Sequence, residues 1–231
     1  MPSQHHIPVQ KTARYYTLGQ IGPEITDVWF ACHGYGQLAS DFAAEFECIE
    51  APERLIVVPE ALSRFYVPAG PGLHGPDAKV GATWMTREDR ESEIADYVSY
   101  LDELYGEIMK GLDAKNTTVT VLGFSQGGAT VRRWLMRGKV SADRLLLWGS
   151  LLASDVDLDQ AATLFRKIEL KIVYGTRDQF ADPVMIAGYE AKLKEKQVPC
   201  EIVTFDGGHR MDRDTLRRLA AEFPKRRPLA E

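Results

Sequence analysis

Short apolar segments alternate with longer segments of helical periodicity along almost the whole chain. Seven segments have the length and the β-branched or aromatic content of strands: 14–18, 27–32, 54–58, 117–122, 144–148, 170–174 and 201–205. Apolar residues recur at helical spacing in 38–49, 88–112, 127–137, 160–165, 183–196 and 212–222. Residues 55–58 and 145–148 are apolar at every position, as strands buried on both faces require. The alternation predicts an α/β fold with a mostly parallel, doubly wound sheet and helices on both faces.

Size and composition are those of an ordinary globular protein. The chain has 231 residues, of which 45% are hydrophobic and 26% charged, and this length fits one domain over residues 1–231. A formal net charge of −5 provides no basic footprint for phosphate contacts, so we expect no nucleic-acid partner. The polar segment 1–10 lacks the apolar stretch of a secretory signal, and no apolar run is long enough for a membrane span.

The three cysteines, Cys32, Cys48 and Cys200, are widely separated in the sequence. Their odd number and the lack of a CxxC pair argue against a disulfide framework and against a metal site. We therefore expect reduced thiols, a cytoplasmic location, and neither a metal nor another cofactor.

The most specific motif is Gly123-Phe124-Ser125-Gln126-Gly127, which follows the strand 117–122 and opens the helix 127–137. A serine on so sharp a turn adopts a strained conformation that pushes its hydroxyl out of the sheet, and the glycines let strand and helix approach closely. This context predicts that Ser125 is a nucleophile. The alternative is a glycine-rich turn in which the serine only caps the helix.

A nucleophilic serine needs a base, and the base needs an orienting acid. In this architecture the order along the chain is Ser, acid, His, and His209 is the only histidine after Ser125. Asp178 follows the strand 170–174 and is our first choice for the acid. Asp206 ranks second because Asp-Gly is ordinary turn chemistry, and Asp182 ranks third because Asp182-Pro183 has the features of a helix N-terminus.

Acyl transfer also requires donors for the developing oxyanion. The backbone N–H of Gln126, directly after the nucleophile, is one expected donor. The second is expected from the Tyr35 N–H in His33-Gly34-Tyr35-Gly36, which follows the strand 27–32. His33 lies in this oxyanion loop, where a structural hydrogen-bonding role is expected rather than that of a base.

The segment 61–86 interrupts the alternation and is rich in proline and glycine, so we expect a long irregular loop. It contains Phe65, Tyr66, Trp84 and Met85, which either line a substrate pocket or pack the loop itself. Phe180, next to the proposed acid, is a further candidate for the pocket.

Taken together, Gly123-Phe124-Ser125-Gln126-Gly127-Gly128, His33-Gly34, Asp178 and His209 resemble the phospholipase/carboxylesterase branch of the α/β-hydrolase superfamily, which includes acyl-protein thioesterases. The resemblance covers nearly the whole chain. It implies an α/β-hydrolase fold, a Ser125–His209–Asp178 triad, oxyanion donors at Tyr35 and Gln126, a small-molecule ester substrate and a possible homodimer. The chain departs from the family in the longer spacing between Asp178 and Pro183, and in the bulk of Tyr35.

The expected activity is that of a carboxylesterase or lysophospholipase-type serine hydrolase acting on an ester or thioester through an acyl-enzyme. One alternative is an acyltransferase or perhydrolase that uses the same triad with an alcohol or peroxide in place of water. Another is a non-catalytic relative that binds a small ligand.

Overall fold

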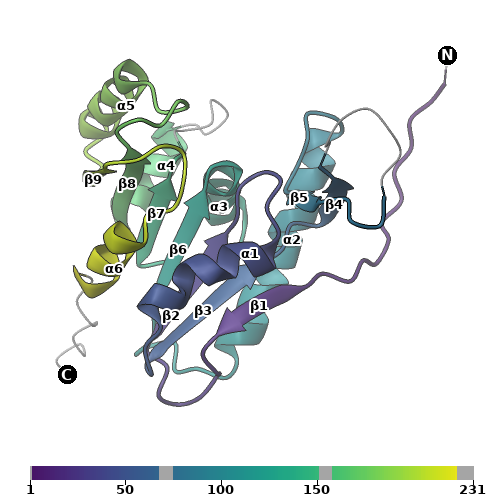
Figure 1. The fold of residues 1–231 in the computed structure, drawn as a ribbon, viewed down its shortest axis with the longest axis horizontal. Helices are drawn as coiled ribbons and strands as arrows, with labels where there is room; N and C mark the ends of the chain where they lie inside the picture. The colour runs from purple at the N-terminus through teal and green to yellow at the C-terminus, as the bar shows by residue number, and fades with distance from the viewer. Residues whose placement is uncertain (1, 68–74, 151–157, 223–231) are drawn as a thin grey trace.

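The computed structural model describes residues 2–67, 75–150 and 158–222. Its centre is a seven-stranded sheet with the order β1-β3-β2-β6-β7-β8-β9 (Figure 1). The strands are β1 (Tyr15–Leu18), β2 (Asp27–Cys32), β3 (Arg54–Pro59), β6 (Thr118–Phe124), β7 (Arg144–Trp148), β8 (Glu169–Gly175) and β9 (Cys200–Phe205). Only β1 is antiparallel to its neighbour in this sheet. The mostly parallel sheet predicted from the sequence is confirmed.

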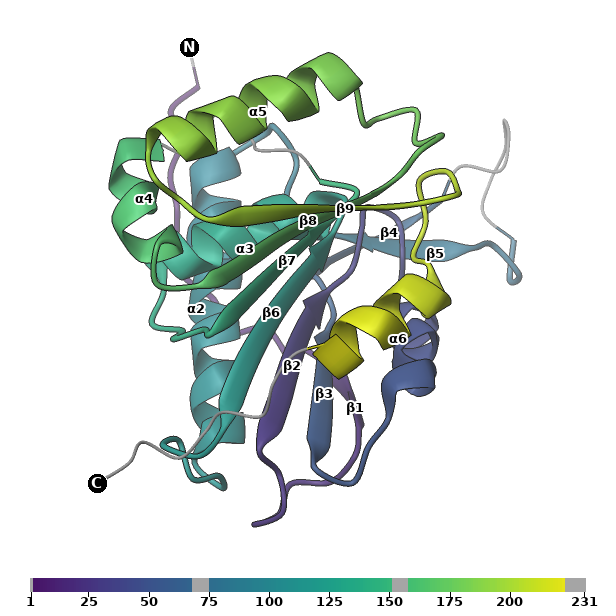
Figure 2. The same cartoon turned by 90° about the vertical axis from the view of Figure 1, so that its left-hand side faces the viewer.

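Helices cover both faces of the sheet, as expected. They are α1 (Ala39–Ala43), the 3-10 helix η1 (Ala44–Ile49), α2 (Arg90–Met109), α3 (Gln126–Arg137), α4 (Leu158–Phe165), α5 (Pro183–Glu195) and α6 (Arg213–Glu222). Buried residues of α2, α3, α4 and α5 form one apolar cluster with the sheet, and those of α1, η1 and α6 form another. Figure 2 shows α2, α3 and α4 on one side of the strands and α6 on the other.

Each central strand contributes to both clusters because successive side chains point to opposite faces. In β2, Phe30 and Cys32 join the cluster with α2 and α3, whereas Trp29 and Ala31 join the cluster with α1 and α6. All four side chains are fully buried. This double burial explains why the strands read as continuous apolar runs.

The segment expected to form one helix over 38–49 divides at Ala44 into α1 and the tighter η1. Phe46 and Ile49 are both buried and lie three residues apart. A 3-10 helix has three residues per turn, so this spacing keeps both side chains on the face that packs against the sheet.

The segment 61–86 is more ordered than expected. β4 (Ser63–Tyr66) and β5 (Val80–Thr83) form a two-stranded antiparallel sheet, with Phe65 opposite Gly81. The prediction of an irregular loop is therefore wrong for these two strands, whose pairing joins residues too distant in sequence for a local turn pattern. The prolines and glycines at 68–72 lie outside the described residues.

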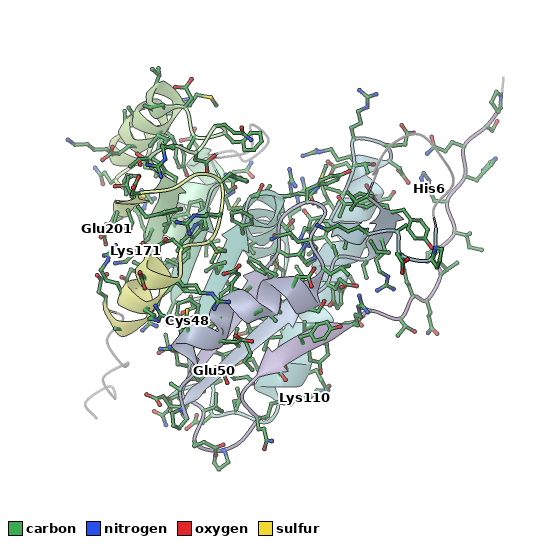
Figure 3. All side chains as sticks on the ribbon, viewed as in Figure 1. His6, Cys48, Glu50, Lys110, Lys171 and Glu201 are labelled. Carbon is green, nitrogen blue, oxygen red and sulfur yellow. The ribbon has the colours of Figure 1, made fainter. Side chains whose placement is uncertain are left out.

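Lys171 on β8 and Glu201 on β9 lie side by side (Figure 3). Where β8 and β9 run side by side, the Lys171 ammonium lies 2.6 Å from a Glu201 carboxylate oxygen and 3.3 Å from one of Glu222 on α6. These contacts tie the last helix to the end of the sheet. Within the described residues, no helix combines the length and the apolar character needed to cross a bilayer.

Candidate active site

Ser125 stands on a strained turn between β6 and α3. Its φ is 52° and its ψ is −116°, a conformation that residues with a Cβ rarely adopt. It occupies the N-cap position of α3, but its side chain makes no capping hydrogen bond. The strain therefore does not serve to cap the helix.

The glycines around Ser125 are required by close backbone approaches. A Cβ at Gly127 would lie 2.1 Å from the Cys32 carbonyl oxygen, and one at Gly123 would lie 2.3 Å from the Gly127 carbonyl oxygen. Contacts this short do not occur for real side chains, so the spacing of the motif follows from the packing of α3 against β2 and β6.

His209 and Asp178 lie in contact beyond the carboxyl ends of β9 and β8. The His209 Nδ1 is 2.8 Å from the Asp178 Oδ2, and the side chains are 17% and 1% exposed. The other carboxylate oxygen of Asp178 accepts a hydrogen bond of 2.9 Å from the Phe180 N–H. The carboxylate is thus held by its own loop and faces the imidazole.

The two competing aspartates have other partners. Asp182 is the N-cap of α5 and accepts a hydrogen bond of 2.8 Å from the Val184 N–H, which confirms the helix start predicted from Asp182-Pro183. Asp206 is largely exposed and pairs with Arg177. Of the three aspartates, only Asp178 contacts the His209 imidazole among the described residues.

The imidazole of His209 packs beside the turn that carries Ser125. Its ring centroid is 4.9 Å from that of Phe124, the residue before the serine. The Ser125 N–H donates to the Trp148 carbonyl at the end of β7, and a Cβ at the next residue, Gly149, would lie 2.9 Å from the His209 Cε1. Among the described residues no hydrogen bond joins the Ser125 hydroxyl to His209. Such contacts commonly tighten only when substrate binds.

The two N–H groups expected to face an oxyanion, those of Tyr35 and Gln126, donate to no acceptor in the described part of the chain. A Cβ at Gly34, next to Tyr35, would lie 3.2 Å from the Ser125 Cβ, so the loop 33–37 runs close to the serine. Unsatisfied N–H groups beside a candidate nucleophile are available for a substrate oxygen.

His33 is fully buried and has the structural role expected from the sequence. The Ala61 N–H donates to its Nε2 at 3.0 Å, and its Nδ1 lies 2.8 Å from the Gly34 carbonyl. Because a carbonyl only accepts, Nδ1 carries a proton. Because Nε2 accepts from the Ala61 N–H, Nε2 carries none, and the ring is neutral. Burial lowers the pKa of His33, against the raising effect of the Gly34 hydrogen bond.

The five residues expected near a pocket lie in three different settings. Trp84 is 2% exposed and belongs to the core, and Met85 packs against the same cluster. Phe65 stacks on Tyr35 at 5.1 Å, and Phe180 meets the His209 ring edge-on at 4.8 Å. Tyr66 is half exposed on β4.

Glu60, directly after β3, is a buried charge that sequence reasoning missed. Its side chain is 1% exposed, and it accepts hydrogen bonds from Arg14 and Arg64 and from the Ala39 N–H at the start of α1. Burial acts to raise the pKa of Glu60, but the two arginines and the Ala39 N–H outweigh it, so the pKa is lowered. No local sequence motif indicates that Glu60 is buried and paired, because its partners come from distant segments.

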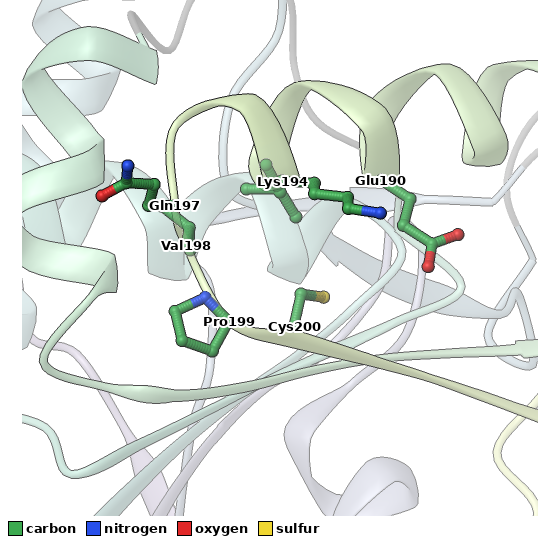
Figure 4. Close-up of a pocket in the computed structure, with 7 residues that line it drawn as sticks. Glu190, Lys194, Gln197, Val198, Pro199 and Cys200 are labelled. Atoms are coloured by element: carbon green, nitrogen blue, oxygen red, sulfur yellow. The ribbon is translucent and has the colours of Figure 1, made fainter.

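A surface hollow of about 360 Å³ lies between α5 and the start of β9 (Figure 4). It is lined by Glu190, Leu193, Lys194 and residues 197–200. This is the amino end of β9, whereas His209 follows its carboxyl end. Burial, followed by the nearby Glu190 and Glu201, raises the pKa of the Cys200 thiol to about 12, which disfavours the thiolate form. Within the described residues no cluster of His, Cys, Asp or Glu is arranged to hold a metal ion.

Several solved structures share this architecture. Esterase PE8 is 18% identical with a TM-score of 0.65, and the match covers 91% of this chain and 97% of that one. A carboxylesterase from Mesorhizobium loti is 19% identical with a TM-score of 0.65, covering 91% and 95%. Acyl-protein thioesterase 2 from Zea mays is 15% identical with a TM-score of 0.63, covering 91% and 97%. At these identities the likeness shows the fold, which is that of the α/β-hydrolases.

No curated protein sequence matches the chain. The family model described as Phospholipase/Carboxylesterase, in contrast, matches residues 24–224. This match confirms the resemblance drawn from the serine motif and its downstream residues. The chain therefore belongs to the phospholipase/carboxylesterase family.

Proposed function

We propose that this protein is a serine hydrolase that cleaves carboxylic esters or thioesters of small molecules through a Ser125–His209–Asp178 triad. Family membership indicates a hydrolase of the esterase type. The finer assignment is supported by the strained turn at Ser125 and by the imidazole packed beside it.

The contact between His209 and Asp178 is the observation that carries the proposal. A carboxylate accepts, so the imidazole Nδ1 carries a proton, and Nε2 is left with a lone pair for the serine hydroxyl. A buried carboxylate beside Nδ1 also stabilises the imidazolium that forms when Nε2 takes a proton. A histidine held in this way is suited to general-base catalysis.

The reaction would proceed in two halves. The Ser125 Oγ attacks the carbonyl carbon while its proton passes to the His209 Nε2, and the carbonyl oxygen becomes an oxyanion held by the N–H groups of Tyr35 and Gln126. The bond to the leaving alcohol or thiol then breaks, and His209 returns the proton to the departing oxygen or sulfur. In the second half water attacks the acyl-enzyme and loses a proton to His209. The bond between the acyl carbon and the Ser125 Oγ then breaks, His209 returns the proton to Oγ, and the carboxylic acid leaves.

Active-site labelling and ester hydrolysis test the proposal together. We expect a fluorophosphonate probe to label the wild-type protein, and p-nitrophenyl esters of increasing chain length and an acyl thioester to be hydrolysed. Ser125→Ala should remove labelling and lower kcat by about 10⁶-fold. Ser99→Ala, at an exposed position of α2, is the matched control and should retain both.

Labelling that survives in Ser125→Ala would show that another residue is the nucleophile. A wild-type protein that neither reacts with the probe nor turns over any ester, yet binds an ester analogue tightly, would point to a ligand-binding relative. Adding an alcohol acceptor distinguishes the remaining alternative, because a transferase would form the new ester in preference to the free acid.

A further inference from the structure

One short segment, residues 81–85, bonds both to the loop that carries Tyr35 and to the side chain of Gln126. We propose that residues 81–85, named here the bracket, set the relative position of the Tyr35 and Gln126 N–H groups. Thr83 and the side chain of Gln126 then act as positioning residues for the oxyanion site. The inference rests on the proposed function, because an oxyanion site matters only if Ser125 attacks a carbonyl.

On one side, the bracket holds the loop 33–37 by its backbone. The Gly36 N–H donates to the Ala82 carbonyl at 2.9 Å, and the Ala82 N–H donates to the Gln37 carbonyl at 3.1 Å. Gln37 and Ala82 thus form an isolated antiparallel bridge, which joins the loop to β5 of the two-stranded sheet. The hydrogen bond of Gly36, the residue directly after Tyr35, therefore fixes the position of the peptide that presents the Tyr35 N–H.

This pairing explains the glycine at position 81. A Cβ there would lie 2.4 Å from the Gly36 carbonyl oxygen, a distance that no side chain tolerates. Gly36 itself has a φ of 76°, in the left-handed region that favours glycine. The two glycines allow the oxyanion loop and β5 to lie in direct backbone contact.

On the other side, the bracket holds Gln126 by its side-chain amide. The Gln126 Nε2 donates to the Thr83 hydroxyl at 3.0 Å and to the Met85 carbonyl at 2.9 Å, and the Trp84 N–H donates to the Gln126 Oε1 at 3.1 Å. The Thr83 hydroxyl also lies 2.9 Å from the Met85 carbonyl, so it can accept from the amide and donate to this oxygen. The amide of Gln126 points towards the bracket, and both its nitrogen and its oxygen make their hydrogen bonds there.

A third link joins the bracket to the start of the oxyanion loop. The indole N–H of Trp84 donates to the His33 carbonyl at 2.9 Å, and the Trp84 and His33 rings lie 5.2 Å apart. Because Trp84 is buried and His33 is fixed by the Ala61 N–H, this link is anchored in the core. The loop 33–37 is thus held at both ends.

The physical consequence concerns catalysis. Two donors stabilise an oxyanion only when both lie about 2.7–3.1 Å from the same oxygen, and a misplacement of about 1 Å can cost about 100-fold in rate. The two N–H groups come from the loop after β2 and from the start of α3, which are more than eighty residues apart in sequence. The bracket bonds to both of these segments and is therefore able to fix the distance between the two N–H groups.

Three variants test the bracket. Gln126→Met keeps the backbone N–H and the side-chain length but removes the three amide hydrogen bonds. Thr83→Val removes only the hydroxyl, and Thr83→Ser restores it. Three properties are measured: kcat and KM on a p-nitrophenyl ester, the inhibition constant of an aryl boronic acid, and the melting temperature. The boronic acid forms a tetrahedral adduct with the serine, and this adduct places an oxygen in the oxyanion site.

We expect Gln126→Met to lower kcat by about 30- to 100-fold and Thr83→Val by about tenfold, with KM within about threefold of the wild type. The boronic-acid inhibition constant should rise in parallel with the loss of kcat, and Thr83→Ser should recover most of the activity that Thr83→Val loses. A merely structural role would lower the melting temperature and leave boronic-acid binding unchanged in the folded protein.

Labelling of the wild type by the fluorophosphonate distinguishes failure of the bracket proposal from failure of the proposed function. If the wild type reacts and turns over esters but Gln126→Met and Thr83→Val keep the wild-type kcat and boronic-acid affinity, the bracket is overturned and the triad stands. The bracket is also overturned if kcat falls without any change in boronic-acid affinity. If the wild type neither reacts nor turns over, the proposed function and the bracket fall together.

Discussion

At the scale of single residues, the imidazole of His209 has very little room to turn. The Phe124 ring lies against it at 4.9 Å, and the Phe180 ring meets it edge-on at 4.8 Å. Gly149, directly after β7, closes a third side: its φ is 54°, and a Cβ there would lie 2.9 Å from the His209 Cε1. Packing and the bond to Asp178 together fix the direction in which Nε2 points.

Gly149→Ala should therefore impair catalysis more than it impairs folding. The added methyl group must push the imidazole away, and we expect kcat to fall by about 100-fold. The positive φ should cost about 1–2 kcal/mol of the free energy of unfolding. Steady-state kinetics at a temperature where the variant is folded, together with urea denaturation, measure the two effects.

Gly188→Ala is the matched control for this substitution. Gly188 is an exposed helical residue in α5, and a Cβ there would meet nothing within 4 Å. We expect this variant to gain about 0.5–1 kcal/mol and to keep wild-type kcat. Equal kinetics for the two alanine variants would refute the packing argument at Gly149.

Residues of the candidate site differ in how visible they are in the sequence. Ser125 lies in a motif with a local steric cause, and His209 is the only histidine after it. Gly149 and Thr83 belong to no motif, because their importance arises from neighbours distant in sequence. A glycine directly after the strand 144–148 was a signal for Gly149, but nothing in the sequence indicated which side chain it faces.

At the scale of elements, the connection from β8 to α5 contains two carboxylates that have different roles. Asp178 turns its carboxylate to His209, whereas Asp182 caps α5 four residues later. The two residues have the same chemistry and differ only in what the surrounding backbone presents to them. Substitutions at the two positions should therefore affect different properties of the protein.

We expect Asp178→Asn to lower kcat on the order of 10⁴-fold with little loss of stability, because the amide oxygen still accepts from the Phe180 N–H while the histidine tautomer is wrong. Asp182→Ala should lower the free energy of unfolding by about 1 kcal/mol and keep kcat. Ester hydrolysis and urea denaturation of both variants decide the assignment. A large loss of kcat in Asp182→Ala alone would reverse it.

Elements with a local pattern were predictable, and those set by distant pairing were not. The strand over residues 144–148 was predicted at its observed bounds, since the four consecutive apolar positions 145–148 define it. β4 and β5 were missed because they pair residues such as Phe65 and Gly81, which are too distant in sequence for a local turn pattern. The division of α1 from η1 likewise follows from packing on the sheet rather than from helix propensity.

At the scale of the whole molecule, one sheet serves two apolar layers. The layer with α2 to α5 and the layer with α1 and α6 share every central strand, since alternate side chains enter each. Neither layer can lose its packing without exposing the opposite face of the same strands. We therefore infer that the two layers unfold together, and this is also what our prediction of a single domain over residues 1–231 requires.

The four tryptophans divide evenly between the layers and allow this to be measured. Trp84 and Trp134 belong to the layer with α2, and Trp29 and Trp148 to the layer with α6; all four are at most 2% exposed. The double variant Trp29→Phe/Trp148→Phe reports on the first layer through the fluorescence that remains. Trp84→Phe/Trp134→Phe reports on the second.

In each double variant the fluorescence midpoint in urea should coincide with the midpoint measured by far-ultraviolet circular dichroism. Both midpoints should lie below that of the wild type, because each substitution removes the hydrogen bond of an indole N–H, at a net cost of about 0.5–1.5 kcal/mol. The common shift in stability does not affect the comparison within one variant. A fluorescence transition that precedes the loss of secondary structure in one variant only would show that its layer unfolds separately, and the sheet would then not couple the two faces.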